Sequence, residues 1–263
     1  MSAPLRLVVL GDSTSFTDDR GPQLPDEPTL YPNVLAGELA ATLDREVALT
    51  VVARAGMTVR EATRTVTKDR HVQFDLLLGA DAVVLGVGSF DHAPGGIPAV
   101  VDAVVPYLRP AALRRRARIG LHAAYPWAVR LTAHRRRRTP PAEFERLYDL
   151  LLLQVRGLAR GAGIVALGPT SHRAAYYAWR HPGHAAAAAH QAEVAGRHGV
   201  PSVACWPFVE PHADALNPDG IHWPAPAHAA VGAALAESLA AQLTGRAPRP
   251  PAPTWDRSGG TAG

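Results

Sequence analysis

Leu-Arg-Leu-Val-Val-Leu-Gly-Asp-Ser, at residues 5–13, is the stretch of this 263-residue chain that indicates its fold most clearly. A short and partly β-branched apolar run that stops at a glycine is typical of a buried strand entering a turn. A serine one turn beyond that strand places its hydroxyl at the edge of a sheet, where backbone N–H groups can hold an oxyanion. Because Gly-Asp-Ser is equally common in turns and at helix N-termini, Ser13 is a candidate nucleophile that needs support from other blocks.

Similar apolar runs alternate with helical patterns along the rest of the chain. We expect strands also at residues 48–52, 82–87, 164–167 and 203–206, and helices at 31–43, 147–158 and 231–243. The second of these helices has one apolar face, formed by Leu147, Leu150, Leu151, Val155 and Leu158. This alternation predicts an α/β fold, a three-layer α/β/α sandwich around a parallel sheet. Ligands of such folds bind beyond the carboxyl ends of the strands, where Ser13, Gly56 and Asp91 fall. The loop before His222 is expected at the same edge.

Two regions fall outside this rhythm. Residues 107–141 are too long for a simple crossover, and we expect a mainly helical, basic insertion over the catalytic edge of the sheet. The tail at residues 246–263 is rich in proline and glycine, so it is predicted to be disordered. Residues 1–245 are therefore predicted to form a single catalytic domain.

Composition excludes several classes of protein. Hydrophobic residues make up 47% of the chain and charged residues 19%, as in ordinary globular proteins. No apolar run reaches the roughly 18 to 20 residues needed to span a bilayer, and the run at residues 5–10 is too short for a signal peptide. A single cysteine, Cys205, rules out an internal disulfide. We expect a cytoplasmic protein with no membrane partner.

Positive charge is concentrated in two arginine clusters, at residues 114–116 and 135–138, within a chain of formal net charge +4. Such clusters form either a solvated basic face or a patch for an anionic partner. Nucleic acid is the weaker candidate because few aromatic residues lie among the arginines and no nucleic-acid motif is present. We expect no nucleic-acid partner, and the sequence leaves the oligomeric state open.

Asp219 and His222 stand three residues apart in Asn-Pro-Asp-Gly-Ile-His-Trp, at residues 217–223. On a tight turn both side chains can point toward one cleft, where the carboxylate or a backbone carbonyl fixes the imidazole tautomer. The alternative is a polar turn with an incidental histidine, one of twelve. Gly56 follows the second expected strand, and its N–H is able to approach a reacting carbonyl closely unless it is simply a turn glycine.

The order and placement of these blocks resemble the SGNH (GDSL-type) hydrolase family, over roughly residues 5–100 and 160–243. The resemblance implies a flavodoxin-like sandwich in which Ser13 is the nucleophile and His222 the general base. It further implies that Asp219 is the triad acid and that the N–H groups of Ser13 and Gly56 form the oxyanion hole. We therefore expect an acyl-transfer enzyme that uses no metal.

One block departs from the family pattern. Gly-Ser-Phe-Asp at residues 88–91 stands where the family has Gly-x-Asn-Asp, so Phe90 replaces the asparagine that completes the oxyanion hole. Loss of one such donor costs on the order of 2.7–4 kcal/mol in a site built around it. Either another donor substitutes, with Ser89 and His92 as candidates, or the hole relies on the backbone N–H groups of Ser13 and Gly56, or the enzyme is slow. We also expect Phe90 to line the acyl-binding side of the site and Asp91 to contact substrate.

A narrower resemblance, to the actinobacterial diglucosylglycerate octanoyltransferase family, covers most of the chain. It rests on residues 12–33, the basic insertion, Gly-Pro-Thr-Ser-His at 168–172 and residues 217–224. It implies that octanoyl-CoA is the co-substrate, with no other cofactor, and that a glucose hydroxyl of diglucosylglycerate accepts the acyl group through an acyl-serine intermediate. The product is a precursor of methylglucose lipopolysaccharides.

The same resemblance gives the arginines a role. Arg136, Arg137 and their neighbours would hold either the CoA phosphates or the glycerate carboxylate, since guanidinium groups bind both. The larger charge of the phosphates favours the donor. Three alternatives remain: a carbohydrate esterase or acyl-CoA thioesterase of the same fold, a catalytically weak glycan-binding relative, and a basic nucleic-acid-binding protein.

Overall fold

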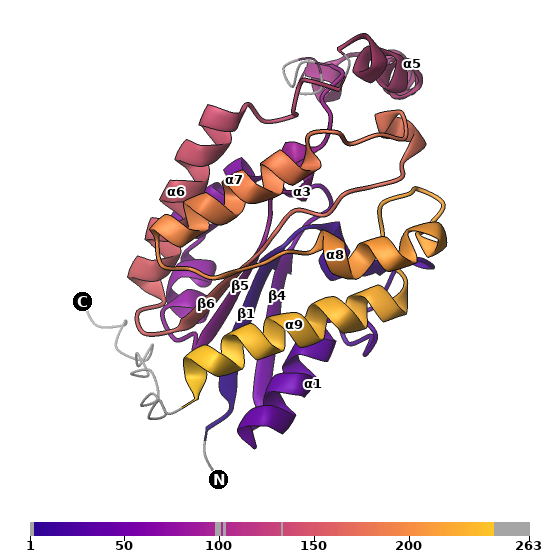
Figure 1. The fold of residues 1–263 in the computed structure, drawn as a ribbon. Helices are drawn as coiled ribbons and strands as arrows, with labels where there is room; N and C mark the ends of the chain where they lie inside the picture. Colours follow the sequence, from indigo (N-terminus) through magenta and orange to yellow (C-terminus); the bar gives the residue numbers. More distant parts are fainter. Residues whose placement is uncertain (1–2, 98–100, 102–103, 133, 245–263) are drawn as a thin grey trace, which may run out of the picture.

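The structure, a computed structural model, describes residues 3–97, 101, 104–132 and 134–244. Its centre is a five-stranded parallel sheet in the order β4-β1-β5-β6-β7 (Figure 1). The strands are β1 (Leu5–Gly11), β4 (Val47–Ala53), β5 (Ala82–Gly86), β6 (Gly163–Leu167) and β7 (Ser202–Val203). Gly11 pairs with Ala53 on one side and with Gly86 on the other. The loops that follow β1, β4 and β5 therefore start at one level of one sheet edge.

Helices cover both faces of the sheet (Figure 1). One face carries α1 (Tyr31–Leu43) and α9 (Ala225–Leu243), and the other carries α2 (Val59–Lys68), α6 (Pro141–Leu158) and α7 (His184–Arg197). Strand β1 serves both cores because side chains alternate along a strand: Val8 and Leu10 face one core, Leu7 and Val9 the other. Its apolar run is thus continuous because both of its faces are buried.

Short elements complete the loops around the sheet. They are η1 (Ser13–Ser15), the strand pair β2 (Thr17–Asp18) and β3 (Gly21–Pro22), the π-helical turn η2 (His71–Leu77), α3 (Ser89–His92), η3 (Val105–Tyr107), η4 (Ala175–Tyr177), α8 (Trp206–Val209) and η5 (Glu210–Ala215). The predicted α/β sandwich is confirmed. The last strand is shorter than expected, since it ends at Val203 and Trp206 already begins α8.

The apolar face predicted for α6 is wrong at one position. Leu150 is 36% exposed, whereas Leu151 and Leu152 are fully buried. The buried stripe of this helix therefore runs through Leu152 rather than Leu150.

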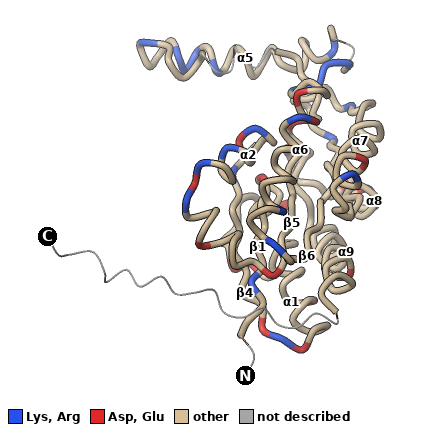
Figure 2. Tube along the Cα trace, turned by 90° about the vertical axis from the view of Figure 1, so that its left-hand side faces the viewer, with Lys and Arg blue, Asp and Glu red and all other residues tan. Residues whose placement is uncertain are grey.

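The insertion is helical, as predicted, but only part of it lies at the catalytic edge. Helix α5 (Ala111–Leu131) buries Tyr125 and Val129 in its second half, against η4. Its first half carries the arginines at 114–116 and extends away from the rest of the protein (Figure 2). The predicted disordered tail lies outside the described residues. Among the helices described, none is long and apolar enough to cross a membrane.

Candidate active site

Ser13, His222 and Asp219 form a continuous hydrogen-bonded chain at the carboxyl edge of the sheet. His222 Nε2 lies 2.9 Å from Ser13 Oγ, and His222 Nδ1 lies 2.5 Å from Asp219 Oδ2. When Nδ1 donates its proton to the carboxylate, Nε2 is left as the acceptor for the serine hydroxyl. The structure thus brings together the three residues expected to form the triad, with Asp219 as the partner of the imidazole.

The carboxylate of Asp219 is fixed by the turn that carries it. Its Oδ1 accepts hydrogen bonds from the backbone N–H of Ile221, at 2.7 Å, and of His222, at 3.2 Å. Partial burial acts to raise the pKa of Asp219. The hydrogen bonds from the His222 ring and from these backbone N–H groups outweigh burial and hold the pKa below its usual value. Asp219 is therefore ionised at neutral pH and stabilises a protonated His222.

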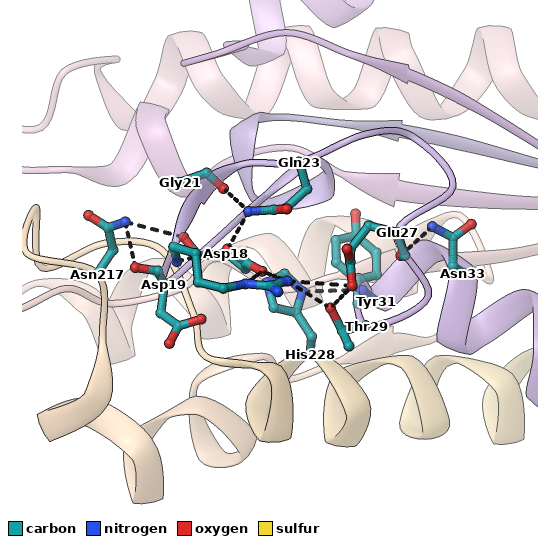
Figure 3. Close-up of polar contacts among 11 residues, drawn as sticks. Asp18, Asp19, Gly21, Gln23, Glu27, Thr29, Tyr31, Asn33, Asn217 and His228 are labelled. Carbon is teal, nitrogen blue, oxygen red and sulfur yellow. Dashed lines mark hydrogen bonds and ion pairs between the residues drawn. The ribbon is translucent and has the colours of Figure 1, made fainter.

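The loop that carries Asp219 is attached to the segment that follows the serine. Figure 3 shows the Asn217 side chain reaching the backbone carbonyls of Asp18, at 3.3 Å, and Asp19, at 3.0 Å. Gly220 supports the turn with a φ of +72°, and its carbonyl accepts from Arg173 N at 2.7 Å. A Cβ at Gly220 would lie 2.4 Å from the Arg173 carbonyl oxygen. The Asn217 side chain therefore holds the His222 loop against the segment that follows Ser13, and a backbone bond holds the same loop against Arg173.

A cavity of about 120 Å³, the catalytic cavity, opens beside the serine. Ser13, Gly56, Phe90, His172 and His222 are among the residues that line it. Gly56 adopts a φ of +63°, and a Cβ on it would lie 3.1 Å from the Phe90 ring. A glycine is required there both by the left-handed backbone and by the contact with the ring. Ser13 and Gly56 face the same space, as an oxyanion hole built on their N–H groups requires.

The two candidate substitutes for the missing asparagine are placed differently. Ser89 lines the catalytic cavity, and its Oγ accepts a hydrogen bond from Thr170 N at 3.1 Å, which leaves its own proton for donation. His92 is 1% exposed and packs on Phe144, with the ring centroids 4.2 Å apart. It does not line the catalytic cavity. Placement therefore favours Ser89 over His92.

The expectation that Asp91 contacts substrate is corrected by the structure. Its side chain is fully buried, and both oxygens are occupied: Oδ2 accepts from Val59 N at 2.8 Å, and Oδ1 accepts from Thr139 Oγ1 at 2.6 Å. Burial raises the pKa of Asp91 to about 6, against the effect of these hydrogen bonds. Asp91 joins three segments of chain and is a positioning residue.

Arg136 and Arg137 line a second and larger cavity, of about 850 Å³, which we call the arginine cavity. Gly56 and Phe90 line both cavities, so the two adjoin. The guanidinium of Arg138 lies over the Phe90 ring, 4.1 Å from its centroid. The other arginine cluster, at residues 114–116, lines neither of these two cavities and lies on the projecting half of α5 (Figure 2).

His172 was not predicted, although it lines the catalytic cavity. It is 6% exposed, and neither ring nitrogen has a hydrogen-bond partner among the described residues. Burial, with the charges of neighbouring histidines, lowers its pKa to about 3, so the ring is neutral at physiological pH. The signal that could have found it is its place in Gly-Pro-Thr-Ser-His at residues 168–172, a segment that carries the narrower family resemblance. In the part of the chain that the structure describes, no cluster of three or more His, Cys, Asp or Glu is able to hold a metal ion.

Known proteins resemble this chain in sequence and in fold. Residues 9–230 match the GDSL-like lipase/acylhydrolase family. The chain is 32% identical over 240 residues to the diglucosylglycerate octanoyltransferase of Mycolicibacterium hassiacum, covering 89% of this chain and 94% of that protein. It is 31% identical over 241 residues to the enzyme of that name from Mycobacterium tuberculosis, covering 89% and 92%. The lipase/acylhydrolase of Enterococcus faecalis has a similar fold, with a TM-score of 0.61 at 15% identity over 94% of this chain and 100% of that one.

Proposed function

The chain belongs to the GDSL-like lipase/acylhydrolase family, and from this premise we propose that it is an acyltransferase that moves an octanoyl group from acyl-CoA to a glucose hydroxyl of diglucosylglycerate. The observation that carries the proposal is the hydrogen-bonded chain from Ser13 through His222 to Asp219. The acyl group and the acceptor are supported by the two diglucosylglycerate octanoyltransferases, which match this chain over most of its length. The product then belongs to methylglucose lipopolysaccharide biosynthesis.

The first half of the reaction loads the serine. His222 Nε2 takes the proton of the Ser13 hydroxyl as Oγ attacks the thioester carbonyl, and the tetrahedral oxyanion is held by N–H groups at Ser13 and Gly56. The carbon–sulfur bond then breaks, and the CoA thiolate leaves with the proton from His222. An octanoyl ester on Ser13 remains, while Asp219 stabilises the transient imidazolium.

The second half of the reaction transfers the octanoyl group from Ser13 to the acceptor. A glucose hydroxyl of the acceptor attacks the octanoyl carbonyl while His222 takes its proton, and the proton returns to Ser13 Oγ as the acyl–serine bond breaks. Transfer competes with hydrolysis because water reaches the same acyl-serine, so a bound acceptor must supply a high effective molarity at the carbonyl. Acceptor binding next to the catalytic cavity is therefore the feature that separates a transferase from an esterase.

An esterase or acyl-CoA thioesterase remains the alternative function, since it needs the same triad and differs only in the second nucleophile. The exposed fraction of the Asp219 side chain, 39%, shows that solvent reaches the rim of the triad. The decisive experiment mixes the protein with octanoyl-CoA, with and without diglucosylglycerate, and identifies the products by mass spectrometry. Octanoyl-diglucosylglycerate formed by the wild type and not by Ser13→Ala supports the proposal. Free octanoate alone, even with acceptor present, identifies a hydrolase.

A further inference from the structure

The arginine cavity is a separate compartment with a wall in common with the catalytic cavity. Its volume is about 850 Å³ against about 120 Å³ for the catalytic cavity, and the shared wall is formed by Gly56 and Phe90. A substrate that occupies the arginine cavity therefore reaches Gly56 and Phe90 and leaves the catalytic cavity beside Ser13 open.

The arginines of this cavity are held in place by backbone hydrogen bonds. Residues 135–139 run alongside residues 91–95, the stretch that directly follows Phe90. The bonds are Thr139 N to Asp91 O at 2.9 Å, Arg138 N to Ala93 O at 3.0 Å, and Gly95 N to Arg136 O at 2.8 Å. An antiparallel bridge between Pro94 and Arg137 belongs to the same pairing. The backbone that carries the arginines is therefore anchored to the segment that shapes the catalytic cavity.

The charges of the cavity are unbalanced in favour of an anion. Its lining contains Arg60 and the arginines at 135–138, but only two carboxylates, Glu61 and Glu143. Glu143 forms an ion pair with Arg60, and Glu61 accepts hydrogen bonds from Thr58 N and Oγ1 at 2.9 and 3.0 Å.

Arg136 and Arg137 have no carboxylate partner among the described residues. Arg137 lines both this cavity and a neighbouring pocket that contains His92 and His181, and partial burial lowers its pKa. A bound anion would therefore relieve an uncompensated charge.

The arginine cavity adjoins the catalytic cavity and is lined by both arginines and glutamates. Both features favour a sugar acid over a polyphosphate as its ligand. The carboxylate of a glycosylglycerate is only a few bonds from the glucose hydroxyls, whereas a long pantetheine arm separates a thioester from its phosphates. The carboxylates of Glu61 and Glu143 can accept further hydrogen bonds from sugar hydroxyls, whereas they repel phosphates. We infer that the arginine cavity binds the acceptor, with Arg136 and Arg137 holding its glycerate carboxylate. This inference rests on the proposed function, and it gives the acceptor the high effective molarity that transfer requires.

The test compares Arg136→Gln/Arg137→Gln with a matched control, Arg114→Gln/Arg115→Gln, which removes the same charge from the projecting half of α5. Three substrates are varied separately: octanoyl-CoA, diglucosylglycerate, and the same glycoside with its carboxylate converted to the neutral amide. The wild type should prefer the acid over the amide by about tenfold or more in kcat/KM.

The cavity variant should lose that preference, with an acceptor KM raised about tenfold or more. Its KM for octanoyl-CoA and its cleavage of nitrophenyl octanoate should stay within about twofold of the wild type. The control variant should match the wild type throughout. Thermal unfolding of both variants shows whether the fold is kept.

Two kinetic results would overturn the inference. A raised KM for octanoyl-CoA with the acid preference intact would place the donor phosphates in the cavity. Unchanged constants for all three substrates would remove any binding role.

If the wild type transfers nothing to sugar, the proposed function fails, and the inference is then tested by calorimetric titration of diglucosylglycerate. Binding by Ser13→Ala that is lost when the two arginines are also replaced supports the cavity as a sugar-acid site. No binding by Ser13→Ala overturns it.

Discussion

Thr139 Oγ1 donates a 2.6 Å hydrogen bond to Asp91 Oδ1 and so joins the arginine segment to the loop that follows β5. The other oxygen of Asp91 accepts from Val59 N, at the start of α2 and just beyond Gly56. One buried carboxylate therefore connects the Gly56 loop, the Phe90 loop and the arginine segment. The wall between the two cavities depends on a group that touches neither of them.

Replacement of Asp91 by asparagine should make stability less dependent on pH. Burial raises the pKa of Asp91 from 3.8 to about 6, so the folded protein holds this proton more tightly than the unfolded chain does. The free energy of unfolding of the wild type therefore falls as the pH rises from about 4 to about 6. Asp91→Asn cannot titrate at this position, so its free energy of unfolding should lack this decrease. The free energy of unfolding of the wild type minus that of the variant should fall by up to about 3 kcal/mol over this range. Urea denaturation at several pH values measures it, and a constant difference would contradict the raised pKa.

The triad variants should form a graded series. Ser13→Ala and His222→Ala should leave less than about a thousandth of wild-type turnover. Each variant removes one partner of the Ser13–His222 hydrogen bond, and no other described residue is placed to replace it. Asp219→Ala should be roughly 10- to 100-fold less damaging than Ser13→Ala, since Asp219 acts only through the imidazole. Nitrophenyl ester cleavage and mass spectrometry of the acyl-enzyme measure the series. Turnover by Ser13→Ala above that level would remove Ser13 as the nucleophile.

The parts of the site that sequence predicts are those whose chemistry is local. Ser13 follows a strand whose apolar run is unmistakable, and Asp219 and His222 are three residues apart on one turn. Their common edge follows from the parallel register, which the alternation of strands and helices indicates.

The arginine cavity could not be predicted in the same way. It forms because residues 135–139 pair with residues 91–95, and a short backbone pairing between distant segments leaves no periodic signal. For the same reason Asp91 was expected to contact substrate, although its partners Val59 and Thr139 occupy both of its oxygens. The sequence pattern likewise does not indicate burial that depends on tertiary packing. Leu150 lies on an apolar helix face yet is 36% exposed, and the polar His172 is buried.

Gly56→Ala should reduce kcat for two separable reasons. The φ of +63° strains any residue with a Cβ, and that Cβ would lie 3.1 Å from the Phe90 ring. Adding Phe90→Leu removes the contact but not the strain, so the double variant should recover only part of the lost activity. Steady-state kinetics with a short nitrophenyl ester measure both. Wild-type kcat in Gly56→Ala would show that the position of this N–H does not matter to the oxyanion.

Phe90 should set the preference for the length of the acyl chain. Its ring lines the catalytic cavity together with the apolar side chains of Ala93, Tyr177 and Ile221, so an acyl chain would lie against it. Burial of each methylene is worth about 0.8 kcal/mol, so losing contact with even two of them lowers kcat/KM by about tenfold. Phe90→Asn should therefore lower the ratio of octanoate to acetate cleavage by about that factor, measured with nitrophenyl esters of increasing chain length.

Phe90→Leu separates the apolar contact from the other consequences of removing the ring. Both variants lose the packing of Arg138 on the ring, 4.1 Å from its centroid, so any effect of that contact is common to them. Leucine keeps an apolar wall and should retain most of the octanoate preference, whereas asparagine should lose it. Asparagine also restores the amide found in the family pattern, so acetate cleavage should be maintained or rise if its N–H reaches the oxyanion. An identical chain-length profile in all three proteins would show that the ring only fills space beside Gly56.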